Sequence, residues 1–314
     1  MQTKSRFLVP LLPLFSIAFL VVSGYIDTER LMGTRDAYLS FVILQLLGFV
    51  LPTVFFCKAR GENYVFRMKL RLFGLEKAVF LIFSVFVMIC AMMAMELFMR
   101  NFGISDGLYA HSVFKIYGRT LPELGANIYD TLYTMVVFAI LPAATEELLF
   151  RSVLYTEYEH LGAPAAIILT SLLYSLLGMS MVSLVPSFVG GLFLGFAMYI
   201  TQSVVAPFVI HVVYNLYCLF LEEYVWAFIS KPENEIFFVF LLITLMLVCS
   251  IMMMSQAERV IYDKGMRKLP TPDYVKSFRA KKKTAVWKET FGAVISPAYL
   301  LCIVLFVLRV VGIV

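Results

Sequence analysis

The sequence predicts an all-α membrane protein, a polytopic bundle of about nine transmembrane helices. Hydrophobic residues make up 61% of the 314 residues and charged residues only 15%, whereas a soluble domain carries about 25% charged residues. Apolar stretches as long as a bilayer is thick follow one another along the chain. The loops between them carry most of the basic residues. Lipid rather than water is therefore the expected solvent.

Each expected helix contains roughly 20 mostly apolar residues, the length that crosses the hydrocarbon core. The candidate spans are residues 7–25, 38–57, 78–98, 131–154, 165–183, 186–203, 204–225, 236–254 and 291–311. Pro186 and Pro207 fit the beginnings of the sixth and seventh helices, where the missing N–H leaves no hydrogen bond unmade. The motifs described below lie in residues 130–225, between N-terminal helices in 1–129 and C-terminal helices in 226–314.

The loops also predict how the helices are oriented in the membrane. If the N-terminus is cytoplasmic and the spans alternate, eighteen Lys and Arg residues fall on the cytoplasmic side and six on the other. Cytoplasmic loops of membrane proteins carry such an excess of basic residues. We therefore expect an integral protein of the plasma membrane with a cytoplasmic N-terminus and an odd number of spans.

The largest polar segment is the loop 255–290, which combines ten Lys and Arg residues with four aromatic residues. Such a segment can lie on anionic lipid headgroups, or it can simply fix the topology. The positive-inside bias alone predicts a loop of this kind. Membrane lipids are the expected partners and nucleic acid is not expected, while the oligomeric state is left open.

Polar residues within the predicted spans form the first candidate site. Charged groups inside a spanning helix cost at least about 2.5–3.5 kcal/mol each, so they need a reason. Glu147 and Arg151 stand four residues apart on the fourth span and can pair. Glu146 points about 100° away from Glu147, which leaves it free to act as a base in a poorly solvated site. A structural ion pair at the helix end explains the same residues.

A second cluster consists of His211 and Asn215, which share one face of the seventh span because they are four residues apart. Histidine can donate, accept or bind a metal, and asparagine can donate to a developing oxyanion. Interhelical hydrogen bonds that hold a bundle together are the alternative. Small residues of the sixth span, Ser187, Gly191 and Gly195, predict close helix packing without chemistry.

Together these clusters resemble the CAAX-protease and bacteriocin-processing (CPBP, or Abi) family of membrane proteases. The family has three ordered motifs, EExxxR, FxxxH and HxxxN. Residues 146–151 read EELLFR and match the first, and residues 211–215 read HVVYN and match the third. The Ser-x-x-x-Pro segment 203–207 also resembles the family's entry to its histidine helix. The likeness covers about residues 130–225.

The resemblance implies an intramembrane endopeptidase that cuts a peptide or lipidated protein. By this likeness Glu146 is the general base, His211 and Asn215 are the oxyanion donors, and Glu147 and Arg151 complete the motif. The segment corresponding to FxxxH, residues 174–178, reads YSLLG. Gly178 therefore stands where the family has the histidine that helps to activate water.

Neither of the other histidines replaces the missing one by sequence position. His111 falls in the long external loop and His160 follows the fourth span. A divalent metal such as zinc would have Glu146, Glu147 and His211 as ligands, and two carboxylates with one histidine is not a usual zinc set. No cofactor is otherwise implied.

Three functions are compatible with these patterns. An endopeptidase would use Glu146 without the motif histidine. A catalytically inactive relative would keep the fold as a membrane scaffold, a binding protein or a bacteriocin self-immunity protein. A transporter would line a path with its charged residues, but these are few and clustered at one end of a span.

Overall fold

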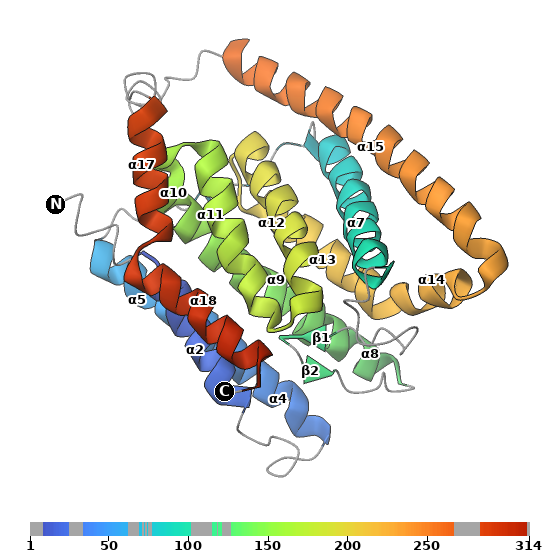
Figure 1. The fold of residues 1–314 in the computed structure, drawn as a ribbon, viewed down its shortest axis with the longest axis horizontal. Helices are drawn as coiled ribbons and strands as arrows, with labels where there is room; N and C mark the ends of the chain where they lie inside the picture. Colours follow the sequence, from blue (N-terminus) through green and yellow to red (C-terminus); the bar gives the residue numbers. More distant parts are fainter. Residues whose placement is uncertain are drawn as a thin grey trace.

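The computed structural model describes residues 9–24, 34–61, 69, 70, 72, 74, 77–101, 115–117, 119, 120, 127–266 and 283–312. The described chain is a bundle of helices with one short hairpin (Figure 1), which confirms the predicted all-α class. Its α-helices are α2 (Leu11–Gly24), α4 (Thr34–Gln45), α5 (Leu51–Arg60), α7 (Ala78–Asn101), α8 (Ile128–Thr134), α9 (Leu141–Glu147), α10 (Tyr155–Tyr158), α11 (Ala163–Ser175), α12 (Met181–Thr201), α13 (Val205–Phe220), α14 (Glu222–Ile229), α15 (Pro232–Met266), α17 (Lys283–Val294) and α18 (Pro297–Val310). The π-helical and 3₁₀ turns are η1 (Leu46–Val50), η3 (Met135–Ile140), η4 (Leu148–Leu154), η5 (Glu159–Leu161) and η6 (Leu176–Gly178). The hairpin pairs β1 (Lys115–Ile116) with β2 (Arg119–Thr120) in antiparallel register.

The described parts of all nine predicted spans are mostly helical, but the helices differ in length. Among the described residues, five helices are long and apolar enough to cross a membrane, namely Tyr38–Arg60, Ala78–Met99, Ile128–Leu161, Met181–Thr201 and Glu233–Tyr262. Two further candidates are helix pairs bent by 56° and 48°, α13 with α14 and the end of α17 with α18. The first and fifth predicted spans correspond to shorter apolar helices, Leu11–Gly24 and Ala163–Gly178. Five to seven spans are thus supported, and nine stays a prediction.

Two of the spans contain π-helical turns that end two residues before a proline, a feature not predicted from the sequence. Pro52 follows η1 and Pro142 follows η3. A proline inside a helix has no N–H for the carbonyl four residues earlier, and a wider turn is one way in which the helix adapts. The carbonyl of Gly48, four residues before Pro52, instead accepts a hydrogen bond from the Ser16 hydroxyl at 2.6 Å. Side chains of neighbouring helices thus satisfy backbone groups that lipid cannot.

Helices α11 and α12 approach each other closely at two glycines of α12. A Cβ atom added at Gly191 would lie 2.9 Å from Ser171 Cβ, and one added at Gly195 would lie 2.9 Å from Ile167 Cγ2. Only a residue without a side chain fits there unless the facing helix moves. The small residues of the sixth span therefore pack helices together, as their spacing predicts. On the other face of α12, α7 packs between α12 and α15 (Figure 1).

The basic loop 255–290 begins later than expected. Helix α15 continues to Met266, so the first twelve residues of the expected loop extend the eighth span as a helix. Residues 267–282, which carry the Lys281–Lys283 run in part, lie outside the described residues, and α17 begins at Lys283. A long helix runs past the bilayer when nothing in its sequence stops it, and this segment contains no proline before residue 270.

Candidate functional site

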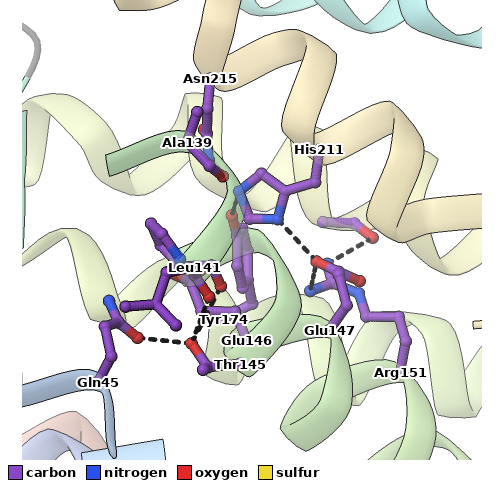
Figure 2. A network of polar contacts seen from close by, with 12 residues as sticks. Gln45, Ala139, Leu141, Thr145, Glu146, Glu147, Arg151, Tyr174, His211 and Asn215 are labelled. Carbon is purple, nitrogen blue, oxygen red and sulfur yellow. Dashed lines mark hydrogen bonds and ion pairs between the residues drawn. The ribbon is translucent and has the colours of Figure 1, made fainter. Parts of the chain in front are cut away.

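The motif residues meet inside the bundle although they come from separate helices (Figure 2). Glu146 and Glu147 end α9, Arg151 lies in η4, and α13 carries His211 and Asn215. All five side chains belong to buried residues, with Glu147 and Arg151 completely enclosed. Because a buried charge is costly, the hydrogen-bond partners of each of these side chains determine what that side chain can do.

Glu147 and Arg151 form the ion pair that their spacing predicts. Arg151 Nη1 lies 3.0 Å from Glu147 Oε1, and Arg151 Nη2 donates to the carbonyl of Gly191 at 3.3 Å. The guanidinium also lies over the ring of Tyr174, with Arg151 Cζ 4.3 Å from the ring centroid. The arginine thus joins η4 to α11 and α12. One side chain neutralises a buried carboxylate and fixes two neighbouring helices.

His211 extends this ion pair to α13. Its Nδ1 lies 2.9 Å from Glu147 Oε1, and its Nε2 lies 3.3 Å from the Tyr174 hydroxyl. Because an ionised carboxylate only accepts, Nδ1–H is the donor, and in the neutral ring Nε2 accepts from Tyr174. Both ring nitrogens therefore already have partners. The resemblance implied a histidine turned toward a substrate oxygen, whereas this one is bound to the second glutamate.

Glu146 is buried, and it accepts a hydrogen bond that helix geometry alone did not predict. The Tyr117 hydroxyl donates a hydrogen bond to Glu146 Oε1. The same hydroxyl accepts from Gln45 Nε2 at 2.9 Å, and Gln45 Oε1 accepts from the Thr145 hydroxyl at 2.5 Å. The first glutamate thus ends a chain of polar groups that reaches back to the second predicted span.

Two residues of the site, Tyr117 and Gln45, were not predicted from the sequence. Tyr117 follows β1 in the long loop before the fourth span, where no helical periodicity ties it to Glu146. Its ring stacks on Phe41 and Phe49, with centroids 6.0 and 5.6 Å away. Gln45, completely buried just before η1, was a visible signal, because a polar amide inside an apolar span needs a partner.

Asn215 forms an interhelical hydrogen bond, the alternative to an oxyanion role. Its Nδ2 donates to the carbonyl of Ala139 in η3 at 3.2 Å. Ala139 lies three residues before Pro142, where the backbone ladder is already disturbed. The amide nitrogen carries a second hydrogen. One hydrogen of the Asn215 amide therefore holds two helices together, and the other can still be donated.

Gly178 has a neighbour in the place where a side chain would go. It ends η6, and a Cβ atom added there would lie 2.1 Å from Ser183 Oγ and 3.0 Å from Ser183 Cβ. A histidine at this position requires Ser183 to move. Tyr174, one helical turn earlier, brings its hydroxyl to His211 instead. A tyrosine and a serine thus occupy the region in which the resemblance places an aromatic residue and a histidine.

Elsewhere in the described chain, no other histidine takes the place of the motif histidine, and no further side chain completes a metal site. His160 lies in η5, where its Nδ1 contacts the carbonyl of Glu157 at 2.6 Å, and it is exposed. His111 lies outside the described residues. Among the described residues, no group of three or more His, Cys, Asp and Glu side chains is placed to hold a metal ion. With both nitrogens of His211 engaged, Glu146, Glu147 and His211 do not fit a zinc site.

Part of the chain matches a known protein family. Residues 128–217 match the family model described as type II CAAX prenyl endopeptidase Rce1-like. The matched range contains the buried glutamates, Arg151, His211 and Asn215, whereas Tyr117 and Gln45 lie before it. No curated protein and no solved structure matches the chain.

Proposed function

Because residues 128–217 match the family model of Rce1-like type II CAAX prenyl endopeptidases, we propose that the protein is an intramembrane endopeptidase of the CPBP type with Glu146 as its general base. The observation that carries the proposal is the buried carboxylate of Glu146 beside a fixed polar cluster. A carboxylate in a poorly solvated site is a better base near neutral pH than one in water. The neighbouring Glu147 is already neutralised by Arg151, which leaves Glu146 for proton transfer.

The proposed reaction is hydrolysis of a peptide bond by water. Glu146 removes a proton from the water while the water oxygen bonds to the peptide carbonyl carbon. The tetrahedral intermediate then loses its C–N bond, and Glu146 returns the proton to the leaving nitrogen. The products are a carboxylic acid, which keeps the second hydrogen of the water, and an amine; Glu146 ends the cycle ionised again.

The other motif residues would orient the substrate and stabilise the intermediate. Glu147, Arg151 and His211 form a connected group that fixes α9, η4 and α13 relative to one another. The second hydrogen on Asn215 Nδ2 is the donor proposed for the oxyanion. One observation supports this role for Asn215. Its only hydrogen-bond partner in the described structure is a backbone carbonyl, so a change in that hydrogen bond would leave no buried charge without a partner.

The substrate that suits such a site is a peptide or lipidated protein held in the membrane. Lipid surrounds the apolar helices, so a water-soluble substrate would have to leave water to reach Glu146. The proposed location is the plasma membrane with a cytoplasmic N-terminus, on the basis of the basic loops.

The test is cleavage by the full-length protein in liposomes. Wild type and Glu146→Gln are incubated with a mixed set of lipidated and transmembrane peptides, and new fragments are identified by mass spectrometry. Removing a general base lowers the rate by about 10²–10⁴-fold, so the fragments should disappear in the variant. Glu159→Gln is the matched control, because Glu159 pairs with Lys69 away from the site. Fragments that persist in Glu146→Gln would refute the assignment.

A second candidate, a catalytically inactive relative that binds a membrane segment or protects against a bacteriocin, is favoured by one observation. The space beside Gly178 is filled by Ser183, so the missing histidine has been replaced by packing. The single variant Gly178→His would clash with Ser183, and the informative variant is therefore Gly178→His with Ser183→Gly. Fragments produced by this double variant and not by wild type would favour the inactive relative over the enzyme.

A further inference from the structure

The turn of the β1–β2 hairpin places Tyr117 in an uncommon position. Tyr117 has a backbone φ of 54°, a left-handed conformation that is unfavourable for a residue with a Cβ atom. Its side chain is 9% exposed although the hairpin belongs to a polar loop between two spans. A strained residue that also buries a phenol needs compensating contacts. Those contacts are the rings of Phe41 and Phe49 and the polar atoms of Gln45 and Glu146.

We propose that Tyr117 is the positioning residue of Glu146. It would take the place of the motif histidine as the neighbour of this glutamate, because Gly178, at the histidine's position, has no side chain. Its hydroxyl donates to Glu146 Oε1 and thereby favours the ionised carboxylate in one orientation. The catalytic part of this proposal rests on the proposed function, whereas the effect on Glu146 itself does not. The hairpin, outside the segment that matches the family model, thus completes the site.

The connections of the Tyr117 hydroxyl support a positioning role over simple packing. The hydroxyl accepts from Gln45, and Gln45 in turn accepts from Thr145, the residue directly before Glu146. Hydrogen bonds in such a chain polarise one another, which strengthens the last donor. By contrast, the buried Tyr299 hydroxyl donates to the backbone carbonyl of Leu169 and, among the described residues, has no hydrogen bond to a carboxylate. Tyr299 therefore provides the control for loss of a buried phenolic hydroxyl.

The experiment measures the reactivity of Glu146 with dicyclohexylcarbodiimide, an apolar reagent that modifies protonated carboxyl groups. The acid proton goes to a carbodiimide nitrogen while the carboxylate oxygen bonds to the central carbon, and rearrangement gives a stable N-acylurea. Full-length wild type, Tyr117→Phe and Tyr299→Phe in liposomes are labelled across a pH series, and mass spectrometry reads the Glu146 peptide. Phenylalanine keeps the ring contacts with Phe41 and Phe49.

Loss of a hydrogen bond to a charged group should raise labelling of Glu146 in Tyr117→Phe about tenfold near neutral pH. Its labelling profile should move to higher pH by about one unit, which is the same tenfold change. Tyr299→Phe should follow the wild-type profile. Gln45→Met, which removes the donor to the Tyr117 hydroxyl, should give a smaller rise in the same direction. Unchanged Glu146 labelling in Tyr117→Phe at every pH would overturn the proposal.

Cleavage measured on the same proteins separates this proposal from the proposed function. If wild type cleaves peptides, Tyr117→Phe should lower the rate and shift its pH profile in the direction of the labelling profile. If labelling rises but no protein cleaves any peptide, Tyr117 still positions Glu146 and the endopeptidase proposal fails. Faster cleavage by Tyr117→Phe would show that the phenol obstructs Glu146, and would overturn the positioning role.

Discussion

Replacing Arg151 by methionine should strongly destabilise the protein, because the change leaves a buried carboxylate without its cation. Arg151 and Glu147 are both completely buried, with 3.0 Å between Nη1 and Oε1. Glu147 Oε2 has no hydrogen-bond partner among the described residues, so the carboxylate depends on what Oε1 binds. Breaking a buried pair by removing one partner costs about 3–5 kcal/mol. We expect Arg151→Met to lower the free energy of unfolding by that amount.

The assay is equilibrium unfolding in detergent micelles, and a second variant makes it specific. In Arg151→Met with Glu147→Gln the charge is gone, and the amide oxygen still accepts from His211. The double variant should recover most of the lost stability. Replacing both members of a buried ion pair by uncharged side chains often changes the free energy of unfolding very little. Arg60→Met is the control, since Arg60 pairs with Glu157 near the surface and such pairs contribute about 0–1 kcal/mol. A single variant that costs less than about 1 kcal/mol, or a double variant no more stable than the single, would refute this reasoning.

Two further predictions concern packing and pH. Gly191→Ala should lower the free energy of unfolding by about 1–3 kcal/mol, because its Cβ atom would lie 2.9 Å from Ser171 Cβ. The control is Gly292→Ala, whose Cβ atom meets no atom within 4 Å and which should leave the free energy of unfolding almost unchanged. Similar unfolding curves for the two variants would contradict the close approach of α11 and α12. Burial lowers the pKa of Lys69 from its usual 10.5, an effect larger than the attraction of Glu159. The unfolded chain then binds this proton more tightly, so the free energy of unfolding of wild type relative to Lys69→Met should rise with pH up to about 10.5 and level off above it. A difference that falls with pH over that window would contradict the direction of the shift.

Helical periodicity was enough to predict the contacts within one helix. The four-residue spacing of Glu147 and Arg151 predicted their ion pair, and the spacing of His211 and Asn215 correctly placed two polar groups on the buried face of α13. Gly191 and Gly195 predicted where α12 approaches its neighbour. In each case the relation is fixed by the geometry of a single helix and by the cost of exposing polar groups to lipid.

Contacts between elements that are distant in sequence could not be predicted in the same way. The hydrogen bond from Tyr117 to Glu146 depends on how a loop hairpin folds against the bundle, and no periodicity encodes that placement. The hydrogen bond between His211 and Glu147 depends on how α9 and α13 are rotated relative to each other, which the periodicity of neither helix encodes. The π-helical turns before Pro52 and Pro142 also shift the register of side chains along their spans.

The most direct test of the central claim is the cleavage rate of Glu146→Gln in liposomes, on the peptide that wild type cuts fastest. The variant must first give the wild-type unfolding curve, so that a lost rate reports chemistry and not folding. We predict a rate at least about 100-fold below that of wild type, with Glu159→Gln unchanged. A folded Glu146→Gln protein that cuts the peptide at the wild-type rate would contradict the account.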